Sequence, residues 1–148
     1  KILVKLGFNI AKPWVYENLR LELGLPDGNR DLIVEKSILL ESGFSELNGV
    51  DWNKGCFIGQ ELTARTKYRG LIKKRLMPVS FNGPPPEAGT LIYSKDKSAG
   101  EIRSSLARDF GGIGLALIRL EALSSSVELL SDGVTVTPLR PHWMLDEL

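Results

Sequence analysis

Cysteine and histidine are nearly absent from this sequence, which has one of each, Cys56 and His142, among 148 residues. A single cysteine excludes a disulfide bond within the chain. One cysteine and one histidine also cannot complete a four-ligand zinc site without several carboxylates or another chain, so we expect no metal site. The scarcity of cysteine is typical of a reducing compartment.

The sequence also lacks a long apolar run and an excess of one charge. No stretch approaches the ~20 apolar residues that span a bilayer, so we expect no membrane partner. The 19 basic and 18 acidic residues give a formal charge of +1, whereas binding nucleic acid as a main task needs a clear basic excess. The start of the chain, Lys1 to Gly7, has neither an initiator methionine nor a signal-peptide pattern. We expect upstream residues of the same protein to be missing.

The first half of the chain carries mixed helix, strand and turn patterns. Ile2, Val4 and Leu6 recur at every second position, which predicts a strand or the end of one over residues 1–10. Apolar residues recur every four positions over 14–23, as Val15, Leu19 and Leu23, and predict a helix that ends at Gly24.

Further along, Asp31 is placed to cap a short helix through Leu40. Residues 43–53 are rich in turn formers and are expected to be mostly irregular. Good helix formers then predict a helix from Gln60 to Tyr68.

From residue 71 onward the pattern changes to short strands separated by tight turns. The predicted strands are 72–81, 90–93, 100–106, 112–119, 127–130 and 134–139. Such a series is typical of a small antiparallel barrel or sandwich, and we expect the barrel because closure removes the edge strands. The fold class is therefore α+β. We place the boundary near Gly70, with a mixed α/β part over 1–70 and a β-barrel over 71–148.

The segment from Lys54 to Gly70 holds the residues best suited to chemistry. Gly55 and Gly59 flank Cys56 and let the backbone approach a ligand closely. Lys54 lies two residues from the sulfur, and a helix that begins near Gln60 would place its positive end beside it. A cation and a helix N-terminus both lower a thiol pKa and favour the reactive thiolate. The alternative is that Cys56 is a small buried hydrophobe, the commoner role of a lone cysteine.

The same segment carries a family pattern: Lys-Gly-Cys-aromatic-x-Gly-Gln-Glu, then x-x-Ala-Arg and aromatic-Arg-Gly. Its positions here are Lys54, Gly55, Cys56, Phe57, Gly59, Gln60, Glu61, Ala64, Arg65, Tyr68, Arg69 and Gly70. The pattern resembles that of folate-binding iron–sulfur-cluster assembly factors, which are similar in fold to the glycine-cleavage T-protein, an aminomethyltransferase. Phe57 stands where tyrosine is common. Because the T-protein lacks this cysteine pattern, the resemblance favours the assembly factors.

The resemblance implies a ring-like protein with tetrahydrofolate in a central channel, to which this chain would supply the later part and the barrel. It implies support of iron–sulfur proteins, notably [4Fe–4S] enzymes, with assembly machinery or client proteins as partners and Cys56 as the key residue. The bacterial cytoplasm and the mitochondrial matrix both suit it. A folate-dependent one-carbon transferase similar to the T-protein is the alternative, and whether any reaction is catalysed stays open.

Three residues of the 14–23 segment are the expected folate contacts by the same resemblance. Arg20 would pair with a carboxylate or pterin oxygen, with Glu22 beside it in an Arg-x-Glu-x-Gly pattern. Tyr16, one helical turn earlier, would stack on a ring. The alternatives are an exposed ion pair and a core tyrosine. Arg65 and Arg69 are the preferred pair from the basic stretch for a polyglutamate tail, with a solvated helix face as the alternative.

Overall fold

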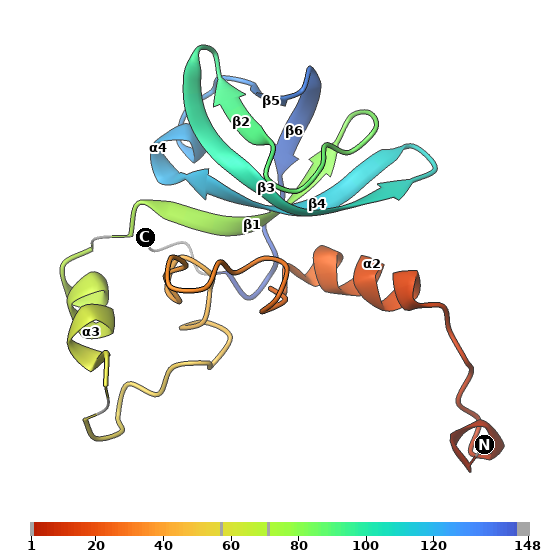
Figure 1. The fold of residues 1–148 in the computed structure, drawn as a ribbon, viewed down its shortest axis with the longest axis horizontal. Helices are drawn as coiled ribbons and strands as arrows, with labels where there is room; N and C mark the ends of the chain where they lie inside the picture. The colour runs from red at the N-terminus through yellow and green to blue at the C-terminus, as the bar shows by residue number, and fades with distance from the viewer. Residues whose placement is uncertain (1, 57, 71, 145–148) are drawn as a thin grey trace.

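A closed barrel of six antiparallel strands forms the centre of the computed structural model (Figure 1), which describes residues 2–56, 58–70 and 72–144. The strands are β1 (Lys74–Phe81), β2 (Leu91–Ser94), β3 (Lys97–Arg108), β4 (Gly111–Arg119), β5 (Leu129–Ser131) and β6 (Val134–Pro138). They are hydrogen-bonded in the order β1-β4-β3-β2-β5-β6. The α+β class with a small barrel is confirmed, and each of the six strands predicted from residue 71 onward is present.

The barrel interior is filled mainly by β-branched side chains. Four of them are completely buried: Val79, Ile92, Ile102 and Ile118. The side chain of Val136 is 2% exposed. Burial of each such side chain stabilises the fold by about 1.5–3 kcal/mol. Because the strands close on one another, no long edge strand is left open.

The long hairpin of β3 and β4 depends on glycine where two strands approach closely. The two strands pair from Gly100 opposite Ile118 to Arg108 opposite Gly111, with an irregular register between Ile102 and Ser104. A Cβ atom on Gly114 would lie 2.3 Å from the backbone oxygen of Ser104. No larger residue fits there without moving the backbone.

Helix α2 (Pro13–Leu23) confirms the helix predicted over 14–23. Proline stands at its start, where a missing N–H costs nothing, and Gly24 ends it with φ 70°. The helix packs on the barrel through Leu21, which is completely buried. Leu21 forms one apolar cluster with Leu76, Ile113 and Leu115 of the barrel strands. Val15 and Leu19, two of the residues whose spacing predicted the helix, remain 42% and 53% exposed and lie outside this contact.

The strand predicted over residues 1–10 is wrong. The structure has a short helix, α1 (Ile2–Lys5), followed by a turn and extended chain. Because the described strands form a closed barrel, no open edge is available for these residues to join. Local bonds satisfy the backbone instead: Leu6 N–H donates to the carbonyls of Ile2 and Leu3.

The helix predicted from Asp31 to Leu40 is also wrong, because this segment forms a series of turns. Asp31 does not cap a helix, since its carboxylate accepts the backbone N–H of Asp27 at 2.7 Å and a guanidinium N–H of Arg20. Residues 43–53 are irregular, as predicted.

Helix α3 (Gln60–Tyr68) has the predicted bounds, and α4 (Leu120–Leu123) was not predicted. The division at Gly70 stays a prediction: it falls between α3 and β1, although α2 shares a core with the barrel. Among the described residues, no helix has the length and apolar character needed to cross a membrane.

Candidate functional site

The predicted site begins in the loop that leads into α3. Cys56 is exposed in this loop, four positions before Gln60, so the alternative of a buried hydrophobe is wrong. Gly59 takes φ 87° at the helix start, where a residue with a side chain would be strained, whereas Gly55 has no such φ. Phe57 lies outside the described residues. The thiol is therefore open to a partner or a ligand.

Trp52 anchors the cysteine loop on α3. The ammonium of Lys67 lies 3.7 Å from the centre of the Trp52 ring, and the Tyr68 ring meets it edge-on at 6.5 Å. The indole N–H donates to Ser45 Oγ at 3.1 Å. One indole thus joins the start of the loop to the last turn of the helix. No local pattern marks Trp52 for this role, because its partners lie 7 to 16 positions away with no regular spacing.

A small hollow lies between this loop and the helix. Its volume is about 50 Å³, too small for more than a water or a small group, and its walls include Lys54 and Gln60. Two of the predicted site residues therefore lie close together, on the inner side of the loop.

The remaining residues of the pattern build and end α3. Glu61 and Arg65 form an ion pair at 3.3 Å, and both are largely exposed, so the pair contributes only about 0.3–0.5 kcal/mol. Arg69 lies just beyond the helix, where its N–H bonds the Arg65 carbonyl, and Gly70 follows with φ 58°. Arg65 and Arg69 thus lie one helical turn apart, at the last turn and the C-cap of α3. Their role as a pair for a polyglutamate tail stays a prediction.

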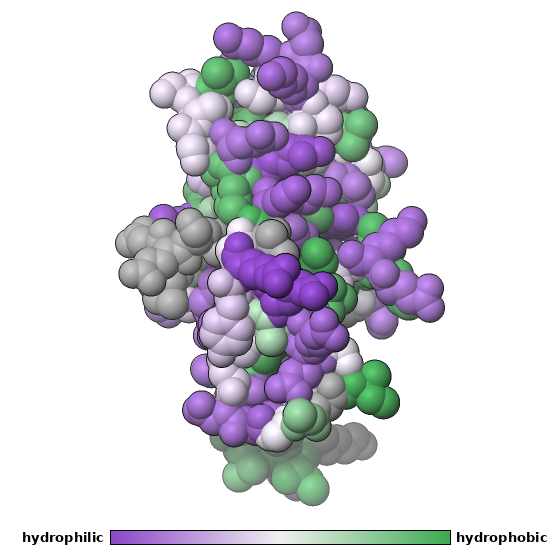
Figure 2. Space-filling view, turned by 90° about the vertical axis from the view of Figure 1, so that its left-hand side faces the viewer, coloured by the Kyte–Doolittle hydropathy of each residue, from purple (hydrophilic) through white to green (hydrophobic). Residues whose placement is uncertain are grey.

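Hydrophilic side chains dominate the side of the molecule on which α3 lies (Figure 2). Hydrophobic side chains appear there only in separate groups. Within the described ranges, no three His, Cys, Asp or Glu side chains are grouped to hold a metal ion. The chemistry of the described residues here therefore depends on exposed single groups, and the role of Cys56 as a nucleophile stays a prediction.

Arg20 is buried and fully engaged within the protein. Its three guanidinium nitrogens donate to Glu17, the Leu25 carbonyl at 2.7 Å, Asp31 at 2.5 Å and Ser104 Oγ at 3.3 Å. Burial alone would lower the pKa of Arg20, but the hydrogen bonds and charges of Glu17 and Asp31 outweigh it and raise the pKa above its usual value. The side chain joins α2, the following turn and β3.

The three predicted folate contacts do not converge. Arg20 is 3% exposed, whereas Tyr16, four residues earlier, is 67% exposed. The Glu22 carboxylate accepts from Arg108 at 2.6 Å on the barrel hairpin. A ligand could reach Arg20 only by displacing its present partners, so the folate role of Arg20 stays a prediction that the geometry does not favour.

A groove of about 560 Å³ runs between α2 and the β3–β4 hairpin. It is lined by Trp14, Asn18, Glu22, Leu106, Ala107, Arg108, Asp109 and Phe110. Arg108 bridges it by donating to both Asn18 and Glu22, and Phe110 at the hairpin turn is 99% exposed. The groove therefore combines aromatic surfaces with a carboxylate and a guanidinium, and Glu22 is the predicted folate residue that lines it.

Arg75 follows Arg65 and Arg69 along the chain but is buried, unlike the exposed Arg65. It is 1% exposed in β1 and pairs with Glu46 from the irregular segment. The neighbouring Leu76 N–H donates to the Glu41 carbonyl at 2.8 Å. Arg75 therefore fixes the segment before the cysteine loop to the barrel and is closed to a polyanion.

Residues 73–146 match the family described as "CAF17, C-terminal beta-barrel domain". This chain belongs to that family. The match begins one residue before β1 and covers the whole barrel, so the CAF17 family assignment and the observed fold agree. The resemblance to iron–sulfur assembly factors noted from the Lys54–Gly70 pattern is confirmed.

The chain is also similar to curated proteins over most of its length. "Iron-sulfur cluster assembly factor IBA57, mitochondrial" is 38% identical over 137 residues in Mus musculus (86% of this chain, 37% of the relative) and 38% over 145 residues in Homo sapiens (93% and 40%). The homologue from Neurospora crassa is 32% identical over 144 residues (76% and 33%). The chain thus spans 33–40% of the length of these relatives.

Proposed function

We propose that this chain is the C-terminal portion of an iron–sulfur cluster assembly factor, with Cys56 as its working residue. Relatives at 38% identity are named iron–sulfur cluster assembly factors and mitochondrial, which favours mitochondria over the bacterial cytoplasm. The observation that carries the role of Cys56 is its exposure in a loop held against α3. The partners are assembly machinery or client proteins.

The exposed loop suits transient contact with a cluster as cargo. A cysteine thiolate is a natural ligand of iron in iron–sulfur clusters. A single exposed sulfur can supply one ligand and then release it, whereas a full set of protein ligands would retain the cluster. Trp52 holds the base of the loop, so the sulfur is presented at a defined place without being buried.

A rescue experiment tests this role. Cells depleted of the endogenous factor receive the full-length protein either unchanged or with Cys56→Ala, and the activity of a [4Fe–4S] enzyme is measured. We expect the Cys56→Ala protein to fail and the matched Ser126→Ala protein, changed at an exposed residue of the barrel, to restore activity. Full rescue by Cys56→Ala would remove the role assigned to the thiol.

We also propose that tetrahydrofolate binds in the groove between α2 and the β3–β4 hairpin. The exposed rings of Trp14 and Phe110 offer stacking surfaces, and Glu22 can accept hydrogen bonds from the N–H groups of a pterin. When bound, the cofactor would supply a carrier of one-carbon units. Arg108 already orients Glu22 from across the groove.

Quenching of tryptophan fluorescence by tetrahydrofolate measures this binding. We expect Glu22→Gln in the full-length protein to weaken binding about tenfold, because a charge-assisted hydrogen bond is lost. Glu87→Gln, at an exposed residue outside the groove, is expected to leave it unchanged. Equal affinities for both variants would place the cofactor elsewhere. Measurable formation of methylenetetrahydrofolate from an aminomethyl carrier would instead support the one-carbon transferase.

A further inference from the structure

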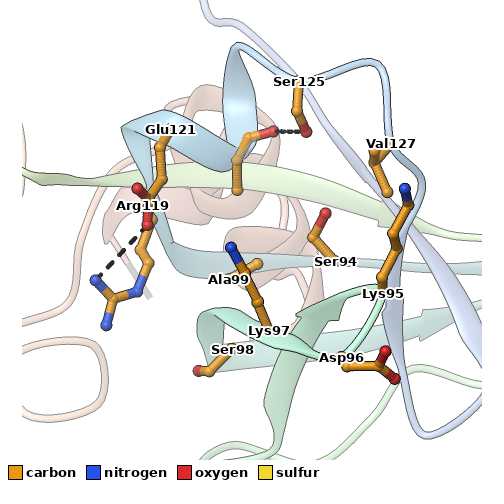
Figure 3. Close-up of a pocket in the computed structure, with 11 residues that line it drawn as sticks. Ser94, Lys95, Asp96, Lys97, Ser98, Ala99, Arg119, Glu121, Ser125 and Val127 are labelled. Atoms are coloured by element: carbon orange, nitrogen blue, oxygen red, sulfur yellow. Dashed lines mark hydrogen bonds and ion pairs between the residues drawn. The ribbon is translucent and has the colours of Figure 1, made fainter.

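A further cavity lies at one end of the barrel, separate from the hollow at the cysteine loop and from the α2 groove. Its volume is about 430 Å³, within the range of small-molecule sites. The β2–β3 hairpin, the end of β4, α4 and the link from α4 to β5 surround it (Figure 3). It shares no lining residue with the two sites described above.

The β2–β3 hairpin supplies a cationic wall. Ser94 pairs with Lys97 across the hairpin, and Lys95 takes φ 54° in the turn between them. Figure 3 shows the side chains of Ser94, Lys95 and Lys97 on the side of the hairpin that faces α4, whereas the Asp96 carboxylate points away. Asp96 also lines the cavity, but its carboxylate turns away from the two ammonium groups.

The floor of the cavity is apolar, and it is hollow because its residues are small. Ala99 of β3 and Ala122 of α4 are 2% and 8% exposed, and both belong to the barrel core. Val127 is half-buried at one side. The hydroxyl of Ser125 donates to the Ala122 carbonyl at 2.9 Å, which fixes the link that forms the upper wall.

The cationic groups of this cavity are weakly compensated. Arg119 and Glu121 approach only to 4.0 Å, and the Glu121 side chain is 79% exposed, so their attraction is largely screened by solvent. Within the described part of the chain, no carboxylate lies within ion-pair distance of Lys95 or Lys97. Three cations and two carboxylates, those of Asp96 and Glu121, thus line the cavity. Among the described residues, Lys95 and Lys97 form no ion pair with either carboxylate.

We propose that this barrel-end cavity binds a small organic anion that carries a phosphate or carboxylate group on an apolar body. Lys95, Lys97 and Arg119 would hold the anionic group, because ammonium and guanidinium groups form charge-assisted hydrogen bonds with such oxygens. The apolar body would cover Ala99 and Ala122. The cavity and its charges make this site independent of the role of Cys56.

Chemical shifts of the backbone amides of the full chain test the site, with phenyl phosphate as the probe. We expect saturable shifts confined to residues 94–99 and 119–127, with a Kd on the order of 1 mM. Phenylacetate is expected to cause the same pattern, since it carries a carboxylate on a similar body. Benzyl alcohol, which lacks the charge, is expected to bind much more weakly. No saturation by about 10 mM phenyl phosphate, or equal binding of benzyl alcohol, would overturn the proposal.

Two matched variants distinguish binding in this cavity from nonspecific attraction of the probe to lysine side chains. Lys97→Gln removes one ammonium from the cavity wall and is expected to weaken phenyl phosphate binding about tenfold. Lys36→Gln removes the same charge at an exposed residue outside the cavity and is expected to change the affinity less than about twofold. An equal loss in both variants would show only a nonspecific effect of net charge and would contradict the site.

Discussion

At the scale of single residues, Arg20 joins parts of the chain that are far apart in sequence. It connects α2 to Asp31, 11 positions away, and to Ser104, 84 positions away. We expect Arg20→Ala to lower the free energy of unfolding by about 3–5 kcal/mol, because it leaves the buried Asp31 carboxylate without its cation. Arg20→Lys should recover only part of the loss, since an ammonium cannot reproduce the fork of a guanidinium. Urea unfolding measures both.

Arg30 is the matched control for this prediction. It contacts Glu17 at 2.8 Å, the same residue that pairs with Arg20, but its side chain is 52% exposed. Arg30→Ala is therefore expected to change the free energy of unfolding by less than about 1 kcal/mol. If the two arginine variants were equally mild, the buried network would not stabilise the contact between α2 and the barrel as described.

Asp27 gives a prediction that depends on pH. The backbone N–H of Asn29 donates to the Asp27 carboxylate, and this hydrogen bond lowers the pKa of Asp27 below the ordinary 3.8. The backbone N–H and the charge of Arg30 lower this pKa further. The stability gained is complete above pH 3.8 and is lost as the pH falls through the lower folded value. Asp27→Asn should therefore be less stable than the unchanged protein at neutral pH. The difference should stay constant down to about pH 3.8 and shrink as the pH falls further.

Urea unfolding at a series of pH values measures this difference. A difference in the free energy of unfolding that stayed constant to well below pH 3.8 would mean that the charge of Asp27 does not contribute to stability. Only the shape of its turn would then matter.

At the scale of elements, the cysteine loop depends on the contact of Trp52 with α3. Trp52→Leu removes the stacked cation, worth about 0.5–1 kcal/mol, and the hydrogen bond to Ser45. We expect amide hydrogens of residues 50–56 to exchange faster in this variant while those of the barrel strands keep their protection. Trp14→Leu, on the exposed face of α2, is the control and should leave the loop unchanged. Equal protection of the loop in all three proteins would refute the anchor.

The barrel makes a separate prediction at Gly114. Gly114→Ala would place a Cβ atom 2.3 Å from the Ser104 backbone oxygen, so the β3–β4 pair must move apart. We expect a loss of about 1–3 kcal/mol in the free energy of unfolding. Gly83→Ala meets only the Val134 side chain, at 3.5 Å, and is expected to be nearly neutral. A neutral Gly114→Ala would show that the two strands are not in this register.

Local sequence patterns correctly predicted a helix that forms its own backbone hydrogen bonds and strands that lie between tight turns. The α3 helix and the six strands followed from helix formers and from short β-branched runs between turns. The two wrong predictions, 1–10 and 31–40, fell where distant groups decide the structure. No strand edge was open to the first segment, and Arg20 occupies the carboxylate of Asp31 that would have capped the second.

The site could be predicted only as far as it lies in one stretch of sequence. The segment from Lys54 to Gly70 was found because its residues are consecutive. The groove beside Glu22 and the barrel-end cavity are built from residues separated by up to about 90 positions, as in the contact of Asn18 with Arg108. Such contacts leave no periodic trace in a single sequence.

At the scale of the whole molecule, the chain combines a barrel that is closed and well packed with an N-terminal part that contacts it through α2. The barrel carries its own core, whereas Leu21 and Arg20 are the buried side chains of α2. Asn18 and Glu22 of the same helix bond Arg108 of the barrel hairpin. The cysteine loop and α3 lie beyond β1, away from this contact (Figure 1). Changes in the loop should therefore leave the barrel intact, which allows the role of the thiol to be separated from stability.

The availability of the Cys56 thiol is tested most directly by its rate of alkylation with iodoacetamide. Because the chain has one cysteine, the rate reports on a single group. We expect the folded full chain to react within about tenfold of the urea-unfolded chain, as an exposed sulfur should. A rate in the folded protein slower by about a hundredfold or more would show a protected thiol and contradict its proposed role at the surface.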